Sequence, residues 1–421
     1  MGQITHIYFP PQASIFCYVK RPLQKPAMSS TCLLFVPTRA LSWAVWLADL
    51  SVLLSSNPQL RRNWSWSRTR RDVPSHLNHE GLALGSGGLA ILQRLPAPPT
   101  QVAVYAIKLP FLSIAEEDFT NASIDFEAYA RHAKFVTAPG IFPVVSASIG
   151  EAAHLDSQER IKLIQTLRLA LDDIGLYKTP IVAGVGAHST RQTTQLAHDA
   201  AAAGADFVLV VPPGYYAGVL KTNPTAIRKF FIDVAAASPV PVIIYNFPAV
   251  SAGIDLSSDD VVEIAKAAPN ICGIMLSCGN VGKLARITAL VDDSSFKTLA
   301  GFIDFLLPSV AVGSAGAISP LPNVAPNFSS KLWQVAQSLG SGVDFQEAKE
   351  LQGKASLGET ALLKEGLPGL KGLLNQQFGY PAAPRLPLMV VSNDAVTKMS
   401  ANKHLQDVMA QEKILETMKE R

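Results

Sequence analysis

Three hydroxyl-bearing residues, Ser148, Tyr216 and Tyr245, are the strongest candidates for chemistry, because each follows or ends a short run of apolar residues. A tyrosine hydroxyl that is sheltered from water can relay protons, provided that its surroundings lower its working pKa. The same rings could instead only close the mouth of a barrel with their hydroxyls in water. Glu151 and His154 follow Ser148 closely, but His154 is more simply a packing residue where a helix begins. The residue types alone leave both interpretations open.

Met275 stands out for the opposite reason, because its thioether is neither an acid, a base nor a nucleophile. It lies in ICGIMLSCGN (271–280), which predicts a short buried strand that ends in a small polar turn. In α/β proteins the ends of such strands are where chemistry tends to occur. Cys272 and Cys278 are expected to be buried small hydrophobic residues, since no basic residue lies near enough in the sequence to favour a thiolate.

The composition excludes several classes of partner. The 421 residues are 48% hydrophobic and 16% charged, which allows a sizeable core. The formal net charge of +3 is weak, so nothing indicates nucleic acid or an acidic membrane surface as a partner. The apolar segment 40–54 is too short to span a membrane and contains Asp49. The four cysteines have neither metal-ligand spacing with histidine nor the number of a disulfide framework, so we expect no metal and a reducing compartment.

The elements that must position these residues alternate regularly from about residue 101. Eight strand–helix units follow one another, and the strands are nearly continuous Val/Ile/Leu runs, as a parallel sheet buried on both faces requires. The expected strands are 102–108, 141–147, 180–186, 206–213, 241–248, 271–276, 296–301 and 316–319. This count predicts a (β/α)₈ TIM barrel over 101–340, followed by a C-terminal helical segment, 341–421. A doubly wound open sheet is the alternative, but it usually has fewer units.

Residues 1–100 differ from the rest and are expected to be a disordered or unreliable extension. Residues 1–71 contain nine basic side chains and one acidic side chain, a composition typical of a mitochondrial transit segment. The segment could also be absent from the mature protein. GSGGLA (85–90) fits a dinucleotide-binding pattern, but the preceding residues are too polar for a strand, so a flexible linker is favoured over a nicotinamide site. We expect a cytoplasmic protein, with a mitochondrial location as the alternative.

Several motifs at the predicted strand ends together resemble the dihydrodipicolinate synthase/N-acetylneuraminate lyase (DapA) family of pyruvate-dependent class I aldolases. The resemblance runs from about residue 120 to 388 and is closest in style to fungal members that resemble hydroxy-oxoglutarate or deoxy-hexulosonate aldolases. The matching pieces are GEAAHLDSQER (150–160), AGVGAHSTRQTTQLAHDAAAAGAD (183–206), VPPGYYAG (211–218), VIIYNFP (242–248), GIMLSCGNVGKLAR (273–286) and GSAGAIS (313–319). The resemblance implies a lyase or aldolase that acts on pyruvate or a related 2-keto acid without metal or organic cofactor.

The resemblance also assigns roles to residues. In the family, a lysine at the end of the sixth strand forms a Schiff base with pyruvate, and the iminium then acts as an electron sink. That position is Met275 here. Tyr245 corresponds to the tyrosine that shuttles protons. Tyr216 corresponds to the tyrosine that one subunit contributes to the site of its neighbour. The resemblance therefore implies a homo-oligomer, either a dimer or a tetramer.

The resemblance places the carboxylate of the keto acid against the loop after the second strand. Ser148 keeps one hydroxyl there, Ile149 replaces a polar residue, and Ala147 replaces a glycine, which could restrict the turn. Gly301 and Ile318, at the ends of the seventh and eighth strands, complete the expected substrate-binding site.

Methionine cannot form an imine, and three explanations of Met275 remain open. The chain could have lost aldolase chemistry and serve as a keto-acid binder or oligomer partner. It could retain a lyase or dehydratase-type reaction that uses Tyr245 and Ser148 without covalent catalysis. The sequence could also come from a damaged or mispredicted gene copy. Neither Lys283, expected to face solvent or a neighbouring helix, nor Lys297, near the start of the seventh strand, is expected to replace the missing lysine.

Overall fold

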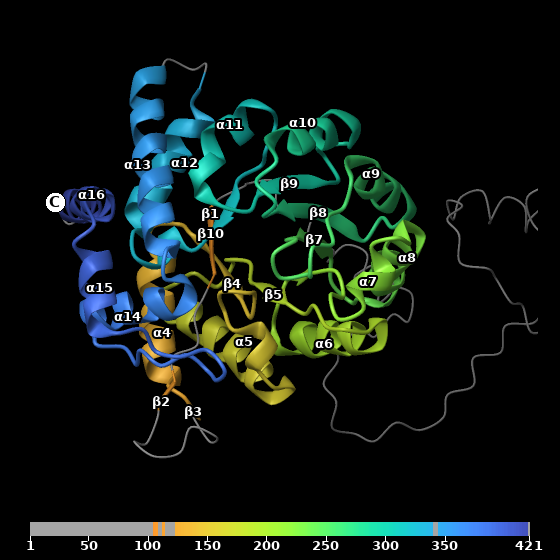
Figure 1. Ribbon diagram of the computed structural model, residues 1–421, viewed down its shortest axis with the longest axis horizontal. Coiled ribbons are helices and arrows are strands. Elements are labelled where there is room, and N and C mark those ends of the chain that lie inside the picture. Colours follow the sequence, from red (N-terminus) through yellow and green to blue (C-terminus); the bar gives the residue numbers. More distant parts are fainter. Residues whose placement is uncertain (1–103, 108–111, 114–122, 340–343, 420–421) are drawn as a thin grey trace, which may run out of the picture. The chain divides into compact units, whose positions relative to one another are not determined.

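A computed structural model describes residues 104–107, 112–113, 123–339 and 344–419 of the chain. Eight parallel strands form a closed barrel in which β1 pairs with both β4 and β10 (Figure 1). The strands are β1 (Val104–Ile107), β4 (Phe142–Val145), β5 (Val182–Gly184), β6 (Phe207–Val210), β7 (Val242–Asn246), β8 (Ile271–Leu276), β9 (Lys297–Ala300) and β10 (Ala317–Ser319). Each lies inside one of the expected apolar runs, so the predicted (β/α)₈ barrel is confirmed.

Most of the long helices that follow the strands begin where the sequence supplies a capping side chain. Asp156 and Glu159 form a reciprocal capping box at the start of one of these helices, as their spacing predicts. The long helices of the barrel are α4 (Phe126–Thr137), α5 (Ser157–Asp172), α6 (Thr190–Ala203), α8 (Pro224–Ala237), α9 (Ser258–Ala267), α10 (Val281–Leu290) and α12 (Pro326–Gln337). The shorter elements are β2 (Leu112–Ser113), β3 (Ser123–Ile124), η1 (Ala152–His154), α7 (Ala217–Leu220), η2 (Ile303–Phe305), α11 (Leu306–Ala311) and η3 (Leu321–Asn323).

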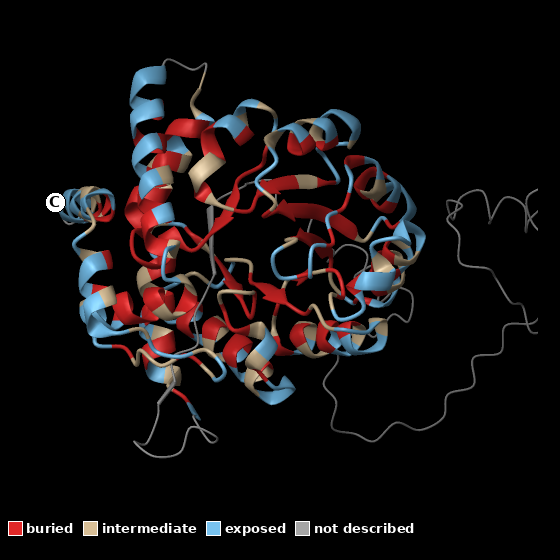
Figure 2. Cartoon of the chain, in the orientation of Figure 1, coloured by how far each residue is buried: buried red, intermediate tan, exposed pale blue. Residues whose placement is uncertain are grey.

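The barrel has an inner and an outer apolar layer because side chains alternate along each strand. Ile244 and Ile274 belong to the outer layer between strands and helices, whereas Tyr245 and Met275 belong to the inner cluster. Figure 2 shows the strands from β4 to β10 as mostly buried. The inner cluster consists of Val144, Ala147, Val182, Phe207, Leu209, Ile243, Tyr245, Cys272, Met275, Leu299, Ala315 and Ile318.

Four further helices pack beside the barrel: α13 (Phe345–Leu363), α14 (Gly366–Phe378), α15 (Asn393–Ser400) and α16 (Lys403–Lys419) (Figure 1). Glu412 of α16 accepts hydrogen bonds from the backbone N–H groups of Asn327 and Phe328, at 3.0 and 2.7 Å. Ala325, the residue that precedes α12, has no side chain able to cap it. A carboxylate from α16 therefore satisfies the exposed N–H groups at the start of α12.

The predicted extension, 1–100, and GSGGLA (85–90) lie outside the described residues, so the expectations about them and about the domain boundaries stay predictions. In the described ranges, no helix is both long enough and apolar enough to cross a membrane.

Candidate functional site

Tyr245 and Met275 lie side by side on the inside of the barrel. The register of β7 and β8 places them directly opposite one another. Both are in the inner cluster, with only 4% and 1% of their surface exposed. The position expected for an imine-forming lysine is therefore next to the expected proton-shuttling tyrosine, but it holds a buried thioether.

The Tyr245 hydroxyl belongs to a small hydroxyl network at the strand ends. It lies 2.8 Å from the Ser148 hydroxyl, so the structure brings together two of the three hydroxyl-bearing residues singled out in the sequence. Burial raises the pKa of Tyr245 to about 12, and hydrogen bonds with Ser148 and Ser277 oppose this rise. A proton relay would need a lowered working pKa, so the neutral hydroxyl of Tyr245 is suited to donating a hydrogen bond rather than to acting as a base.

The loop after β4, residues 146–151, is folded tightly against itself. The N–H of Glu151 donates to the carbonyl of Ser148 at 3.2 Å, and the N–H of Ala152 donates to the carbonyl of Ala147 at 3.1 Å. The positive φ values fall on Ser146 and Glu151, at 55° and 54°. Ala147 is not among the residues with a positive φ, so alanine in place of glycine does not strain that position.

The Ser146 hydroxyl is buried and has no hydrogen-bond partner among the described residues. Ile149, next in the same loop, is half-buried and packs against both apolar clusters. A buried hydroxyl without a partner is costly, so Ser146 would gain a hydrogen bond from a polar ligand at this loop.

Gly301 and Ile318 also lie at the strand ends. A Cβ atom on Gly301 would lie 2.4 Å from the Cα atom of Ser277, so only glycine allows the end of β9 to approach β8 this closely. Ile318 is fully buried in the inner cluster. Both residues are where the sequence placed them, and their roles in substrate binding remain predictions.

Tyr216 lies apart from the hydroxyl network in the single chain. Its side chain is 67% exposed, and its ring centroid lies 4.9 Å from that of Tyr215, which is itself 73% exposed. The Tyr215 ring in turn lies 5.7 Å from His188 in the loop after β5. These three rings form an exposed aromatic group, so Tyr216 presents its ring outward.

The two lysines considered as replacements are ion-paired elsewhere. Lys283 is buried rather than facing solvent, because its Nζ pairs with Asp255, which also accepts a hydrogen bond from the side chain of Asn246 at 2.7 Å. Lys297 lies at the start of β9 and pairs with Asp293 at 2.7 Å. In the part of the chain that the structure describes, no group of three or more His, Cys, Asp or Glu side chains is placed to hold a metal ion.

Glu151, a weak candidate from the sequence, forms a fully buried ion pair with Lys371 of α14. The Nζ and Oε1 atoms lie 2.6 Å apart, and neither side chain is exposed. Sequence reasoning missed Lys371 because it lies 220 residues from its partner. Its only local signal is a single lysine in an otherwise apolar stretch, GLPGLKGLL (366–374).

Comparisons with known proteins agree with the barrel fold. The sequence profile of the Dihydrodipicolinate synthetase family matches residues 117–406. A protein of Emericella nidulans named "Probable 4-hydroxy-2-oxoglutarate aldolase, mitochondrial" is 39% identical over 275 residues, which cover 65% of this chain and 86% of that protein. The L-threo-3-deoxy-hexylosonate aldolase of Hypocrea jecorina is 34% identical over 76% of this chain and 100% of its own length. The crystal structure of a dihydrodipicolinate synthase family protein from Coccidioides immitis matches with a TM-score of 0.65 and 34% identity, over 76% of this chain and 99% of that chain.

Proposed function

Because the chain belongs to the dihydrodipicolinate synthetase family, we propose that it binds pyruvate or a related 2-keto acid at the C-terminal ends of its strands and that Met275 prevents imine formation there. The observation that carries this proposal is the position of Met275, buried directly opposite Tyr245 while the Tyr245–Ser148 hydrogen bond persists. The position that the resemblance assigns to a lysine holds Met275, whereas Tyr245 and Ser148 supply hydroxyl groups at the strand ends.

The groups that remain support binding of a keto acid without a covalent bond. Tyr245 is protonated at neutral pH, since burial raises its pKa to about 12, and it can donate a hydrogen bond to a carbonyl oxygen. Ser148 and Ser146, whose hydroxyl has no hydrogen-bond partner among the described residues, lie in the loop that would receive the carboxylate. Such polarisation of a carbonyl is a weaker electron sink than an iminium, so any lyase reaction here proceeds slowly.

The first prediction concerns Met275→Lys and uses reductive trapping. The protein is incubated with pyruvate and borohydride, and the intact mass is measured for the wild type, Met275→Lys and Met275→Leu. We expect an adduct on Met275→Lys alone, because only that variant places an amine beside Tyr245. Met275→Leu controls for repacking at the same position.

Each other outcome of the trapping experiment has a distinct meaning. An adduct on the wild type would show that another lysine has taken the role, and the proposal would be wrong. No adduct on any variant, in a protein that remains folded, would favour the alternative function, a catalytically inactive homologue that acts as an oligomer partner.

The proposed assembly is a homo-oligomer, either a dimer or a tetramer, in which Tyr216 contacts a second copy. Its support is the exposed aromatic group of His188, Tyr215 and Tyr216, because large exposed rings are enriched at protein interfaces. Sedimentation of the wild type and of Tyr216→Ser measures this, and a monomeric wild type would contradict it.

The proposed location is the mitochondrion rather than the cytoplasm. Two observations support it: the basic, acid-poor composition of residues 1–71, and the word mitochondrial in the name of the Emericella nidulans relative. Fusion of residues 1–100 to a fluorescent protein would test it directly.

A further inference from the structure

The C-terminal segment makes hydrogen bonds and ion pairs with the loop after β4 and with the helix that follows it. Glu151, its last residue, accepts hydrogen bonds from Lys371 Nζ at 2.6 Å and from the backbone N–H of Arg385 at 2.7 Å. The guanidinium of Arg385 pairs with Glu159 and donates to the carbonyl of His154 at 3.0 Å. Two segments of the C-terminal region, α14 and the chain around Arg385, therefore fix both the end of this loop and the start of the next helix.

The Glu151–Lys371 pair lies where water cannot compensate for a lost partner. Both side chains are fully buried, and burial lowers the pKa of Lys371 while the Glu151 carboxylate opposes this. Breaking a buried pair from one side leaves an isolated charge in the interior, which is strongly unfavourable. The pair therefore favours the single loop conformation in which the two groups meet.

That loop conformation sets the position of Ser148. Glu151 adopts a left-handed backbone conformation, φ 54°, and its own N–H closes the loop on the carbonyl of Ser148. The Ser148 hydroxyl then meets the hydroxyl of Tyr245 at 2.8 Å. A continuous series of contacts thus runs from Lys371 through Glu151 and Ser148 to Tyr245.

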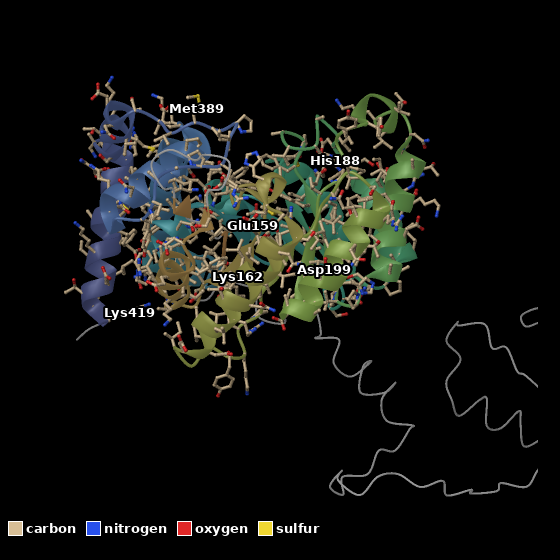
Figure 3. All side chains as sticks on the ribbon, turned by 90° about the horizontal axis from the view of Figure 1, so that it is seen from below. Glu159, Lys162, His188, Asp199, Met389 and Lys419 are labelled. Carbon is tan, nitrogen blue, oxygen red and sulfur yellow. The ribbon has the colours of Figure 1, made fainter. Side chains whose placement is uncertain are left out.

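The C-terminal segment reaches the same side of the barrel as the strand ends. Met389 and His188 lie on one side of the molecule in Figure 3, and Lys162 and Asp199 lie toward the other. His188 follows β5 and so marks the C-terminal ends of the strands. The chain near Arg385 therefore lies on the side of the barrel where the strands end.

We propose that Glu151 and Lys371 are positioning residues, through which α14 holds the loop after β4 in the conformation that receives the carboxylate of the keto acid. The inference rests on the proposed function for the identity of the ligand. The hold on the loop itself rests only on the contacts described above.

The test combines pyruvate affinity by calorimetry with hydrogen exchange of the full-length protein without ligand. We expect Lys371→Met and Glu151→Gln each to weaken pyruvate binding by at least about tenfold, since small displacements of positioning groups have effects of this size. Exchange of the amides at 147–152 should become faster in both variants. Glu412→Gln is the matched control, because it also alters a buried carboxylate held by main-chain N–H groups but acts on α12.

The double variant Glu151→Gln/Lys371→Met separates positioning from stability. It leaves no isolated buried charge, so its unfolding midpoint should recover toward the wild type, whereas its pyruvate affinity should stay low. Recovery of affinity together with stability would overturn the inference, as would unchanged exchange at 147–152 in Lys371→Met. If the wild type itself binds no pyruvate, the proposed function fails, and hydrogen exchange alone decides whether Lys371 holds the loop.

Discussion

At the residue scale, Gly301 matters to the site because it allows the ends of β8 and β9 to lie close together. The N–H of Gly301 donates to the carbonyl of Leu276 at 3.1 Å, and this close approach keeps Ser277 beside the end of β9. Ser277 in turn hydrogen-bonds Tyr245 and counteracts the rise of its pKa. A side chain at 301 would therefore disturb both the packing of two strands and the surroundings of the tyrosine.

Gly301→Ala is expected to lower the free energy of unfolding by about 1–3 kcal/mol, the usual cost of overpacking. Gly353→Ala is the control, because Gly353 lies in the exposed part of α13 and a Cβ atom there meets nothing within 4 Å. It should raise stability by about 0.5–1 kcal/mol through helix propensity. Urea denaturation of both variants measures this, and a shift of equal sign for the two would contradict the close approach.

How far the site could be predicted also depends on single residues. Tyr245, Ser148 and Met275 were found from the sequence because strand ends carry local signals: an apolar run, then a polar turn. Lys371 was not found from the sequence, because the neighbouring residues do not indicate which distant carboxylate a buried lysine pairs with. Lys283 was expected to face solvent or a neighbouring helix, and its partner, Asp255, was missed for the same reason, since helical periodicity gives a face but not the partner on that face.

At the element scale, α13 holds the segment after β9 much as α14 holds the loop after β4. Gln352 donates to the carbonyls of Ile303 and Asp304 at 3.0 and 2.8 Å. Glu359 accepts the N–H of Asp304 at 2.9 Å and is hydrogen-bonded to the Ser319 hydroxyl at the end of β10. The eight strands were predictable because most are nearly continuous apolar runs, although β9 (KTLA) contains two polar residues. The two-residue strands β2 and β3 were not, because they are too short to show a period.

Glu359 gives this contact a pH dependence. Burial and, to a smaller extent, the nearby Asp304 carboxyl raise its pKa to about 8, although the hydrogen bond from Ser319 opposes the rise. An unfolded glutamate has a pKa of about 4.3. Between these values the folded protein holds a proton that the unfolded chain has released, so the free energy of unfolding falls as pH rises, by up to about 1.4 kcal/mol per pH unit.

Glu359→Gln should remove this slope, because the amide keeps the shape and hydrogen-bonding capacity of the protonated acid without its ionisation. Wild type and variant are compared by urea denaturation from pH 5 to pH 8.5. The wild type should lose stability relative to the variant across this range and then level off above about pH 8. A constant difference between the two proteins would mean that Glu359 does not titrate there.

At the scale of the whole molecule, the barrel and the C-terminal helices depend on one another. The contacts that join them are charged or polar groups in buried positions: Glu151 with Lys371, Glu359 with Ser319, and Glu412 with the start of α12. Apolar packing accompanies them, since Leu351 and Leu362 of α13 are buried in the same core cluster as the outer faces of the strands. The helices after residue 343 are therefore part of the same folded unit as the barrel and cover part of its core.

A chain that ends at Leu339 is accordingly expected not to form the barrel. Truncation removes two partners of Glu151, Lys371 and the backbone N–H of Arg385, so these contacts no longer fix the loop after β4. Each large apolar side chain that loses its cover costs about 1.5–3 kcal/mol, against a typical total stability of about 5–15 kcal/mol. The truncated chain should show no cooperative thermal transition by circular dichroism, and addition of a fragment containing residues 340–421 should restore one. A cooperative transition in the truncated chain by itself would show that the barrel is independent of these helices.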